Sequence, residues 1–303
     1  MKRDIISIRD MDTHTITQIL DLARQAVSKV TDRTQRDESL KGASVSTLFF
    51  ENSTRTKLSF LLAAEYLGAY ADDLNISTSS VNKGETLIDT GKTLDSMGTD
   101  VMIIRHDKVG AAHLLARSVG ASVINGGDGS NEHPTQALLD MFTIQERLGS
   151  LKDVNVTIVG DIASSRVARS NVFGLVKMGA HVTLAGPSTM VSSGMSHFGA
   201  KVTHDVKTAV KGADVIMGLR VQLERHQGAK IPTVGEYARY FGVNKEVLAQ
   251  AKKGALIMHP GPTNRGVEMT AQVLDSEHAV VYDQVKNGVA VRMACLQHVM
   301  EGR

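Results

Sequence analysis

The sequence of 303 residues contains no tryptophan, 4% aromatic residues and a single cysteine, Cys295. One cysteine excludes an internal disulfide bond and argues against a structural zinc site built on cysteine ligands. The low aromatic content, without RNP-like or finger motifs, argues against a nucleic-acid-binding module, and a net charge of +2 is too small to suggest one. We therefore expect a protein of a reducing compartment, the cytoplasm, with Cys295 in the core.

Long hydrophobic runs are also missing. No stretch approaches the length of a transmembrane helix, and the first residues turn polar too early for a signal peptide, so no membrane association is expected. No short repeat or low-complexity segment is present. The chain is 42% hydrophobic and 22% charged, which is typical of a globular protein, and its length suggests two domains of ordinary size.

Short apolar segments alternate with amphipathic ones, which predicts parallel sheets with right-handed helical crossovers. The expected fold class is α/β, with two doubly wound parallel-sheet domains and the active site in the cleft between them. We expect a first domain of residues 1–149, joined by the C-terminal segment 288–303, and a second of residues 150–287. The expected strands are 45–50, 101–104, 122–124, 154–159, 181–185, 213–217 and 255–258. The main expected helices are 15–30, 58–67, 85–97, 114–119, 134–148, 166–178, 245–252 and 291–300.

Polar motifs follow most of these strands. The carboxyl ends of parallel strands face the binding crevice of such a sheet. A set of motifs placed at these ends is therefore stronger support for a functional site than any single motif. The strand ends concerned are Phe50, Ile104, Ile124, Val159, Met217 and Met258.

The segment Ser53 to Thr56 (STRT) is the most informative part of the sequence. It lies between the apolar run Val45–Phe50 and a helix-forming run that begins at Leu58. Backbone N–H groups and the positive end of the helix dipole face such a turn and favour an anion. Three hydroxyls and the Arg55 guanidinium add donors that suit a phosphate. The alternative is an ordinary N-terminal cap beside a solvated arginine.

His133 and Gln136 lie three residues apart at the start of the predicted helix 134–148. This spacing can place an imidazole and an amide on one face of a helix. No metal-binding spacing surrounds the histidine, so we expect hydrogen bonds to a substrate carbonyl and no metal. The alternative is a capped helix start with an incidental histidine.

Three arginines occupy other strand ends. Arg105 ends a buried strand, where its charge needs a partner. Arg166 begins a helix and, as a functional residue, would bind a carboxylate; the alternative is a solvated helix residue. Arg220 follows a strand much as Arg105 does, so the two could approach one crevice from opposite domains. A dinucleotide site at Gly160 is disfavoured because the GxGxxG spacing is missing.

The segment His259 to Pro262 (HPGP) follows the last apolar strand. Two prolines around Gly261 fix a turn and remove two N–H donors, so backbone carbonyls can accept from a substrate NH₂ group. One X–Pro bond here is a candidate for the cis form, which would position those carbonyls. The alternative is a surface turn. Lys83 lies in a polar loop, where a solvated lysine is the commoner interpretation.

Together these motifs resemble those of the aspartate/ornithine carbamoyltransferase family, over nearly the whole chain. FFENSTRT (49–56) resembles the carbamoyl-phosphate loop of that family, and NGGDGSNEHPTQ (125–136) resembles its second signature. The remaining motifs match in the family's order: KGET (83–86), RH (105–106), RVQLER (220–225) and HPGPTNRGVE (259–268). The co-occurrence of all six is highly specific.

The resemblance implies a role for each matching residue. The phosphate of carbamoyl phosphate would be held by Ser53, Thr54, Arg55 and Thr56. The carbamoyl group and its oxygens would be held by Arg105, His133 and Gln136, and its NH₂ by the carbonyls around Gly261 and Pro262. The second substrate, aspartate, would be bound by Lys83, Arg166, Arg220 and Gln222. The family builds its sites at trimer interfaces, so a neighbouring subunit would lend Ser79 and Lys83. The expected catalytic residues are Arg55, Thr56, Lys83, Arg105 and His133.

The implied reaction transfers the carbamoyl group of carbamoyl phosphate to the amine of L-aspartate, without a cofactor, in de novo pyrimidine biosynthesis. An enzyme of the ornithine branch is the close alternative. That branch typically carries a cysteine in the HPGP motif and a carboxylate for the ornithine amine, whereas position 260 is proline here. A noncatalytic phosphate-binding subunit is the remaining alternative, although loss of Arg55, His133 or Lys83 would then be expected. Association with regulatory chains or dihydroorotase is left open.

Two positions depart from the family pattern. Many members carry histidine where Ser164 stands and arginine where Lys57 stands. Neither position is assigned a direct substrate contact, so the departures are expected to affect local packing rather than activity.

Overall fold

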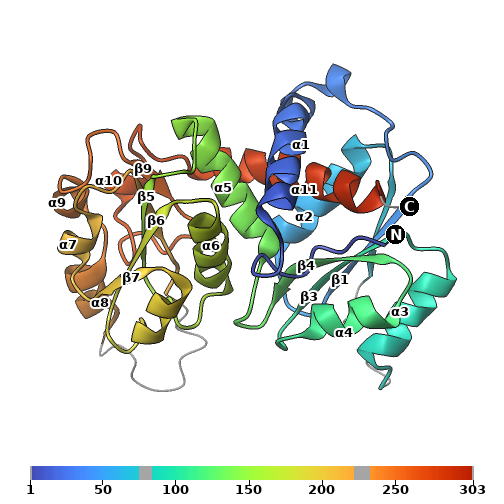
Figure 1. Ribbon diagram of the computed structural model, residues 1–303, viewed down its shortest axis with the longest axis horizontal. Coiled ribbons are helices and arrows are strands. Elements are labelled where there is room, and N and C mark those ends of the chain that lie inside the picture. Colours follow the sequence, from blue (N-terminus) through green and yellow to red (C-terminus); the bar gives the residue numbers. More distant parts are fainter. Residues whose placement is uncertain (1, 75–83, 222–232, 302–303) are drawn as a thin grey trace. The chain divides into compact units, whose positions relative to one another are not determined.

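The computed structural model describes residues 2–74, 84–221 and 233–301 (Figure 1). The chain forms two compact units: Met1–Phe142 with Lys286–Arg303, here called unit 1, and Thr143–Val285, called unit 2. Helices α5 (Pro134–Leu148) and α11 (Val281–Met300) contribute residues to both units. The predicted site residues Ser79, Lys83 and Gln222 lie outside the described residues.

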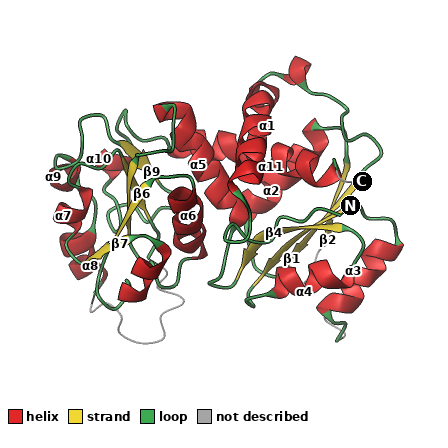
Figure 2. Cartoon of the chain, viewed as in Figure 1, coloured by secondary structure: helices red, strands yellow, loops and turns green. Residues whose placement is uncertain are grey.

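Unit 1 is built on a four-stranded parallel sheet in the order β2-β1-β3-β4. Its strands are β1 (Ser44–Phe49), β2 (Tyr70–Leu74), β3 (Val101–His106) and β4 (Ser122–Asp128). Helices α3 (Leu87–Ser96) and α4 (Ala111–Ser118) cover one face, whereas α1 (Thr13–Thr31) and α2 (Thr54–Tyr66) lie on the other (Figures 1 and 2). The α1 residues at helical spacing, Ile16, Ile19, Leu20, Ala23 and Ala26, are buried.

Unit 2 contains a five-stranded parallel sheet in the order β7-β6-β5-β8-β9. Its strands are β5 (Asn155–Val159), β6 (His181–Ala185), β7 (Lys201–Thr203), β8 (Val215–Gly218) and β9 (Leu256–Met258). Its helices, besides the shared α5 and α11, are α6 (Arg166–Lys177), α7 (Val206–Val210), α8 (Val234–Phe241), α9 (Lys245–Leu248) and α10 (Ala271–Leu274). Buried side chains of α7, α9 and α10 pack on Val159, Ile216 and Ile257 of the sheet. The prediction of two parallel-sheet α/β domains is therefore confirmed.

Each sheet has a point at which the chain reverses its direction of travel across the sheet. In unit 1 the chain moves from β1 to β2 and then returns to β3 on the other side of β1. In unit 2 it moves from β5 through β6 to β7 and returns to β8 on the other side of β5. Open α/β sheets bind their ligands at the carboxyl ends of the strands beside such switch points. The fold thus singles out the ends of β1 and β3, and of β5 and β8.

The element boundaries differ from the sequence expectations in physically understandable ways. Helix α2 begins at Thr54, inside the STRT segment, and α11 begins at Val281, ten residues before the predicted helix start at Val291. The sequence did not predict β2, because its YADDL sequence is polar and it forms the sheet edge, with Tyr70 70% exposed. Cys295 is buried, as expected, and its burial raises the pKa of its thiol to about 12.

Asp214, just before β8, ties together the amino ends of two strands in unit 2. Its carboxylate accepts from the Asn155 backbone N–H (2.9 Å) and from Lys252 Nζ (2.7 Å). Burial alone would raise the pKa of Asp214, but the hydrogen bonds from Lys252 and Asn155 outweigh it and lower the pKa below the ordinary value of 3.8. The carboxylate is therefore more favourable in the folded chain than in the unfolded chain.

We expect Asp214→Ala to reduce the free energy of unfolding by about 1–3 kcal/mol at neutral pH, because a part-buried N–H loses its acceptor. A lowered folded-state pKa contributes stability that is complete above the unfolded pKa and is lost as the pH falls through the folded value. The difference between Asp214→Ala and the unaltered chain should thus be constant from pH 7 to about pH 5 and shrink below about pH 4. Urea titrations at each pH measure it. A difference that grows on acidification would contradict this account.

Candidate active site

The carboxyl end of β1 leads directly into helix α2. Ser53 occupies the N-cap position with an extended backbone, but its side chain makes no capping hydrogen bond, and the first turn of α2 carries no acidic residue. Capping therefore does not account for the Ser53 hydroxyl. The N–H groups of a first helical turn lack intrahelical partners. With Thr54 and Arg55 exposed on the same turn, this helix start has the donors and the positive charge to hold a phosphate.

Arg105 joins the ends of three neighbouring strands. Its guanidinium donates to Glu51 Oε1 (3.4 Å) and to the Gly126 carbonyl (3.3 Å), and its own carbonyl accepts from the Phe50 N–H (2.9 Å). The Arg105 side chain is 12% exposed. The partner that a charge at the end of a buried strand requires is thus Glu51. Sequence reasoning missed Glu51, although a carboxylate inside the FFENSTRT segment was a signal.

The loop from β4 to α5 is held by two buried carboxylates. Asp128 accepts from Asn125 Nδ2 (2.8 Å) and from the Gly110 N–H (2.7 Å). Glu132 accepts from Ser7 Oγ (2.6 Å) and from the Ile8 N–H (2.8 Å). These bonds fix the segment that delivers His133 to the start of α5, so its imidazole is supported by a rigid loop. Sequence reasoning assigned no role to either carboxylate.

His133 and Gln136 are both buried at the start of α5, with 4% and 8% of their surface exposed. The His133 carbonyl accepts from the backbone N–H of Gln136 (3.0 Å), so the histidine is the residue just before the first turn. Gln136 Nε2 donates to Asp140 Oδ1 at 2.9 Å. In unit 1, the predicted site residues that lie in or follow β1, β3 and β4 are therefore all at the carboxyl ends of these parallel strands.

In unit 2, Arg166 and Arg220 follow the two strands beside the switch point. Arg166 is the first residue of α6 and is 6% exposed, and the preceding Ser165 caps the helix by accepting from the Ala168 N–H. Arg220 is half-buried just after β8. The residue before it, Leu219, donates its backbone N–H to the Val159 carbonyl at the end of β5 (2.8 Å). Two cationic side chains on adjacent strand ends suit an anionic ligand, and two carboxylates in particular.

The HPGP turn follows β9, the neighbour of β8, and its Gly261–Pro262 peptide bond is cis. His259 Nδ1 accepts from the Gly261 N–H at 2.8 Å, and the His259 N–H donates to Gln284 Oε1 at 2.9 Å. An imidazole nitrogen that accepts carries no proton, so this bond assigns the ring proton to Nε2. Nε2 lies 3.3 Å from Glu268 Oε1, and both side chains are buried. His259, the first residue of the motif, and Glu268, six residues after its end, thus brace the turn, a role that the sequence did not indicate.

Lys57 and Ser164, the two departures from the family pattern, have local contacts. Lys57 Nζ lies 2.9 Å from Asp73 Oδ2 on β2, and the Ser164 backbone N–H donates to Asp161 Oδ1 at 3.3 Å. The Lys57 contact connects α2 to β2 in unit 1, and the Ser164 contact lies within the loop between β5 and α6 in unit 2.

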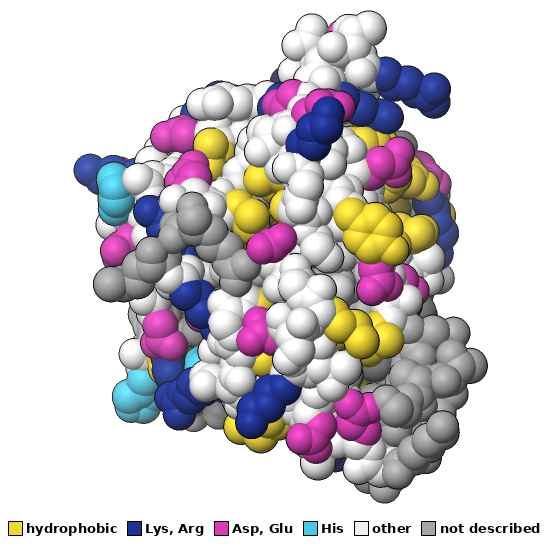
Figure 3. Space-filling model, turned by 90° about the vertical axis from the view of Figure 1, so that its right-hand side faces the viewer, with side chains coloured by type: hydrophobic (Ala, Val, Ile, Leu, Met, Phe, Trp, Pro, Cys, Tyr) yellow, Lys and Arg dark blue, Asp and Glu magenta, His cyan; other side chains and the backbone are white. Residues whose placement is uncertain are grey.

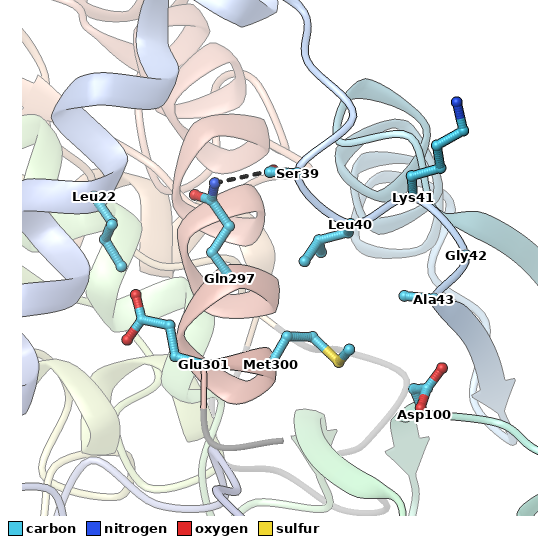
Figure 4. Close-up of a pocket in the computed structure, with 10 residues that line it drawn as sticks. All are labelled: Leu22, Ser39, Leu40, Lys41, Gly42, Ala43, Asp100, Gln297, Met300 and Glu301. Atoms are coloured by element: carbon cyan, nitrogen blue, oxygen red, sulfur yellow. Dashed lines mark hydrogen bonds between the residues drawn. The ribbon is translucent and has the colours of Figure 1, made fainter.

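A separate pocket of about 500 Å³ lies in unit 1 (Figure 4). Its lining includes Ala43 and Asp100, which directly precede β1 and β3, so the pocket is at the amino ends of these strands. Gln297 Nε2 donates to Ser39 Oγ across it at 3.3 Å. None of the predicted site residues lines this pocket. Its lining residues are Leu22, Ser39, Leu40, Lys41, Gly42, Ala43, Asp100, Gln297, Met300 and Glu301.

Within residues 2–74, 84–221 and 233–301, no group of three or more His, Cys, Asp or Glu side chains is arranged to hold a metal ion. Over the same residues, no helix is both long enough and apolar enough to cross a membrane.

Comparison with known proteins places these features in a family. The carbamoyl-phosphate-binding domain of aspartate/ornithine carbamoyltransferases matches residues 3–146, and the Asp/Orn-binding domain of the same enzymes matches residues 152–299. The chain belongs to the aspartate/ornithine carbamoyltransferase family.

Among its relatives in sequence is the aspartate carbamoyltransferase catalytic subunit of Ruminiclostridium cellulolyticum, which is 54% identical over 97% of this chain and 94% of that protein. The corresponding subunit of Caldanaerobacter subterraneus subsp. tengcongensis is 50% identical over 100% of this chain and 99% of that protein.

Among solved structures, ornithine carbamoyltransferase from Pyrococcus furiosus has a TM-score of 0.88 and 32% identity, covering 100% of this chain and 98% of that one. Aspartate transcarbamoylase from Trypanosoma cruzi, in complex with carbamoyl aspartate and phosphate, also has a TM-score of 0.88, with 30% identity over 97% of this chain and 95% of that one. The fold is therefore common to both branches of the family.

Proposed function

We propose that this chain is an enzyme that transfers the carbamoyl group of carbamoyl phosphate to the amine of L-aspartate, in de novo pyrimidine biosynthesis. The observation that carries the proposal is the placement of cationic side chains at both switch points. In unit 1, Arg55 lies in the first turn of α2, after β1, and Arg105 is the next-to-last residue of β3. In unit 2, Arg166 begins α6, the helix that follows β5, and Arg220 follows β8. Relatives that are about half identical over the whole chain carry the name aspartate carbamoyltransferase.

The residues of unit 1 supply the carbamoyl-phosphate half of the site. The phosphate lies at the start of α2, with donors from Ser53, Thr54, Arg55 and Thr56. The carbamoyl group is held by Arg105, His133 and Gln136, and the carbonyls around Gly261 and Pro262 accept from its NH₂. Thr56, Arg105 and His133 stabilise the negative charge that develops on the carbonyl oxygen, which is the main catalytic effect of preorganised donors.

The reaction requires no covalent intermediate on the protein. The unprotonated aspartate amine attacks the carbamoyl carbon, a C–N bond forms, and the C–O bond to phosphate breaks. The departing phosphate takes the amine proton, so no dedicated protein base is needed. Binding both substrates together supplies a proximity effect of up to about 7–11 kcal/mol in ideal cases.

The residues that bind aspartate are Arg166, Arg220, Gln222 and Lys83. Two carboxylates on the substrate match cationic partners on the protein. Ornithine instead carries a cationic side chain, which Arg166 and Arg220 would repel. The charge of the second substrate's side chain therefore separates the two branches, whereas the shared fold does not.

We further propose a cytoplasmic homotrimer in which a neighbouring subunit lends Ser79 and Lys83 to each site. An exposed apolar surface supports self-association: Leu58 and Leu62 of α2 and Tyr70 of the edge strand β2 are 51%, 36% and 70% exposed. Hydrophobic side chains lie among charged ones on the face of unit 1 that Figure 3 shows. A single buried cysteine suits a reducing compartment.

The specificity claim is tested by incubating the purified chain with carbamoyl phosphate and either aspartate or ornithine, and following phosphate release in parallel. We expect rapid release with aspartate and only the spontaneous rate with ornithine. Arg166→Ala, Arg220→Ala or both should raise the KM for aspartate by at least about tenfold, because each substitution removes a charge-assisted bond. Faster turnover of ornithine than of aspartate would overturn the assignment.

A further inference from the structure

The amide of Gln136 is held in one orientation by a buried neighbour on the same helix. Its Nε2 donates to Asp140 Oδ1 at 2.9 Å, one helical turn further along α5, and Asp140 is fully buried. Among the residues that the structure describes, no group donates to Gln136 Oε1. With its nitrogen engaged, the amide presents its carbonyl oxygen, which is only an acceptor.

Arg292 of α11 places a positive charge near Asp140. Arg292 is 4% exposed, donates to the Gly288 carbonyl (3.0 Å) and lies 5.1 Å above the Phe60 ring. Burial lowers the pKa of Arg292 to about 10, while the nearby Asp140 carboxylate acts in the opposite direction. Arg292 is thus a cation at neutral pH, and its charge attracts the Asp140 carboxylate. An ionised carboxylate can only accept, so it cannot pair with the carbonyl end of the amide.

We propose that Asp140 is a positioning residue, which acts through Gln136 to direct its carbonyl oxygen at the NH₂ group of carbamoyl phosphate. The inference rests on the proposed function and refines it, because it gives Asp140, which does not touch the substrate itself, a part in positioning Gln136. A site with a buried, oriented acceptor rejects an analogue that lacks the matching donor, because the acceptor is then left without a partner. Asp140 therefore contributes to the choice of acyl phosphate.

Acetyl phosphate is the discriminating probe, since a methyl group replaces the NH₂ and the phosphate is kept. Calorimetry on the full chain would give the Kd of carbamoyl phosphate, acetyl phosphate and inorganic phosphate. We expect Asp140→Asn to reduce the preference for carbamoyl over acetyl phosphate by about tenfold, because an asparagine can donate to Gln136 Oε1 and release the amide. The Kd of inorganic phosphate should stay the same, because phosphate does not contact Gln136.

Gln136→Leu should cause the same loss of preference, and combining it with Asp140→Asn should add nothing, because Asp140 acts only through Gln136. If Asp140→Asn fails to fold beside an uncompensated Arg292, the pair Asp140→Asn with Arg292→Met removes both charges and is judged by the same ratio. An equal weakening of all three ligands, or an unchanged ratio, would overturn the proposal. Carbamoylation of aspartate by the unaltered chain is measured in a separate assay. Failure of the proposed function would appear in that assay, whereas failure of the Asp140 proposal would appear in the ratio of the Kd values of acetyl and carbamoyl phosphate.

Discussion

Arg55→Ala is expected to lower kcat/KM for carbamoyl transfer by about 10²–10³-fold, the usual cost of removing one preorganised donor from developing negative charge. Arg55 lies in the first turn of α2, where its charge adds to the helix dipole at the phosphate position. Its side chain is exposed, so the substitution leaves no cavity in the core. The melting temperature should therefore stay within a few degrees while activity collapses.

Arg24→Ala is the matched control. Arg24 is also an exposed arginine on a helix of unit 1, where its Nη1 lies 2.6 Å from Asp21 Oδ1. It belongs to α1 and to none of the strand ends at the switch point, so its loss should leave the kinetics unchanged. Arg55→Lys should recover part of the activity, since it keeps the charge and loses the fork geometry. Activity of Arg55→Ala within about twofold of the unaltered chain would remove Arg55 from the site.

Mixing two variants that are each nearly inactive is expected to restore part of the activity. If each site combines Arg55 of one subunit with Lys83 of the next, Arg55→Ala and Lys83→Ala trimers each lack one charge at every site. Dissociating and reassociating an equal mixture should give about a quarter of the sites both residues intact, by random placement in a closed ring. Steady-state rates of the mixture, with hybrids verified by native mass spectrometry, measure the recovery.

The control for this experiment carries both substitutions in one chain and should stay inactive after the same treatment. Hybrids that form and yet remain inactive would show that Lys83 does not act across a subunit interface. The proposal that Ser79 and Lys83 come from a neighbouring subunit would then be withdrawn, without affecting the roles of Arg55 and Arg105.

Local patterns in the sequence predicted most of the fold and the placement of the site segments. Apolar runs such as 154–159 and helix signals such as Pro134 depend on neighbouring residues, so β5 and the start of α5 lie where they were expected. The edge strand β2 was missed because a polar strand at a sheet edge gives no apolar run.

The pairings inside the site could not be predicted in the same way. Arg105 and Glu51 are 54 residues apart, so the carboxylate in the FFENSTRT segment does not by itself indicate which cation it pairs with. His259 and Glu268 are near in sequence, yet their contact depends on the path of the intervening turn, which the amino-acid sequence alone does not specify. The HPGP motif predicted a rigid turn but not the bracing beneath it. Sequence patterns thus located the side chains, and the structure supplied their partners and orientations.

The most direct test of the central claim follows the new bond itself. The chain is incubated with ¹³C-carbamoyl phosphate and ¹⁵N-aspartate, and the product is observed by NMR while phosphate is quantified. The account predicts a one-bond ¹³C–¹⁵N coupling in the product and, above the spontaneous rate, one phosphate released per coupled product. With Arg55→Ala, both signals should form about 10²–10³-fold more slowly. Enzyme-dependent release of phosphate without a coupled product would show hydrolysis of carbamoyl phosphate rather than transfer to aspartate, and would contradict the account.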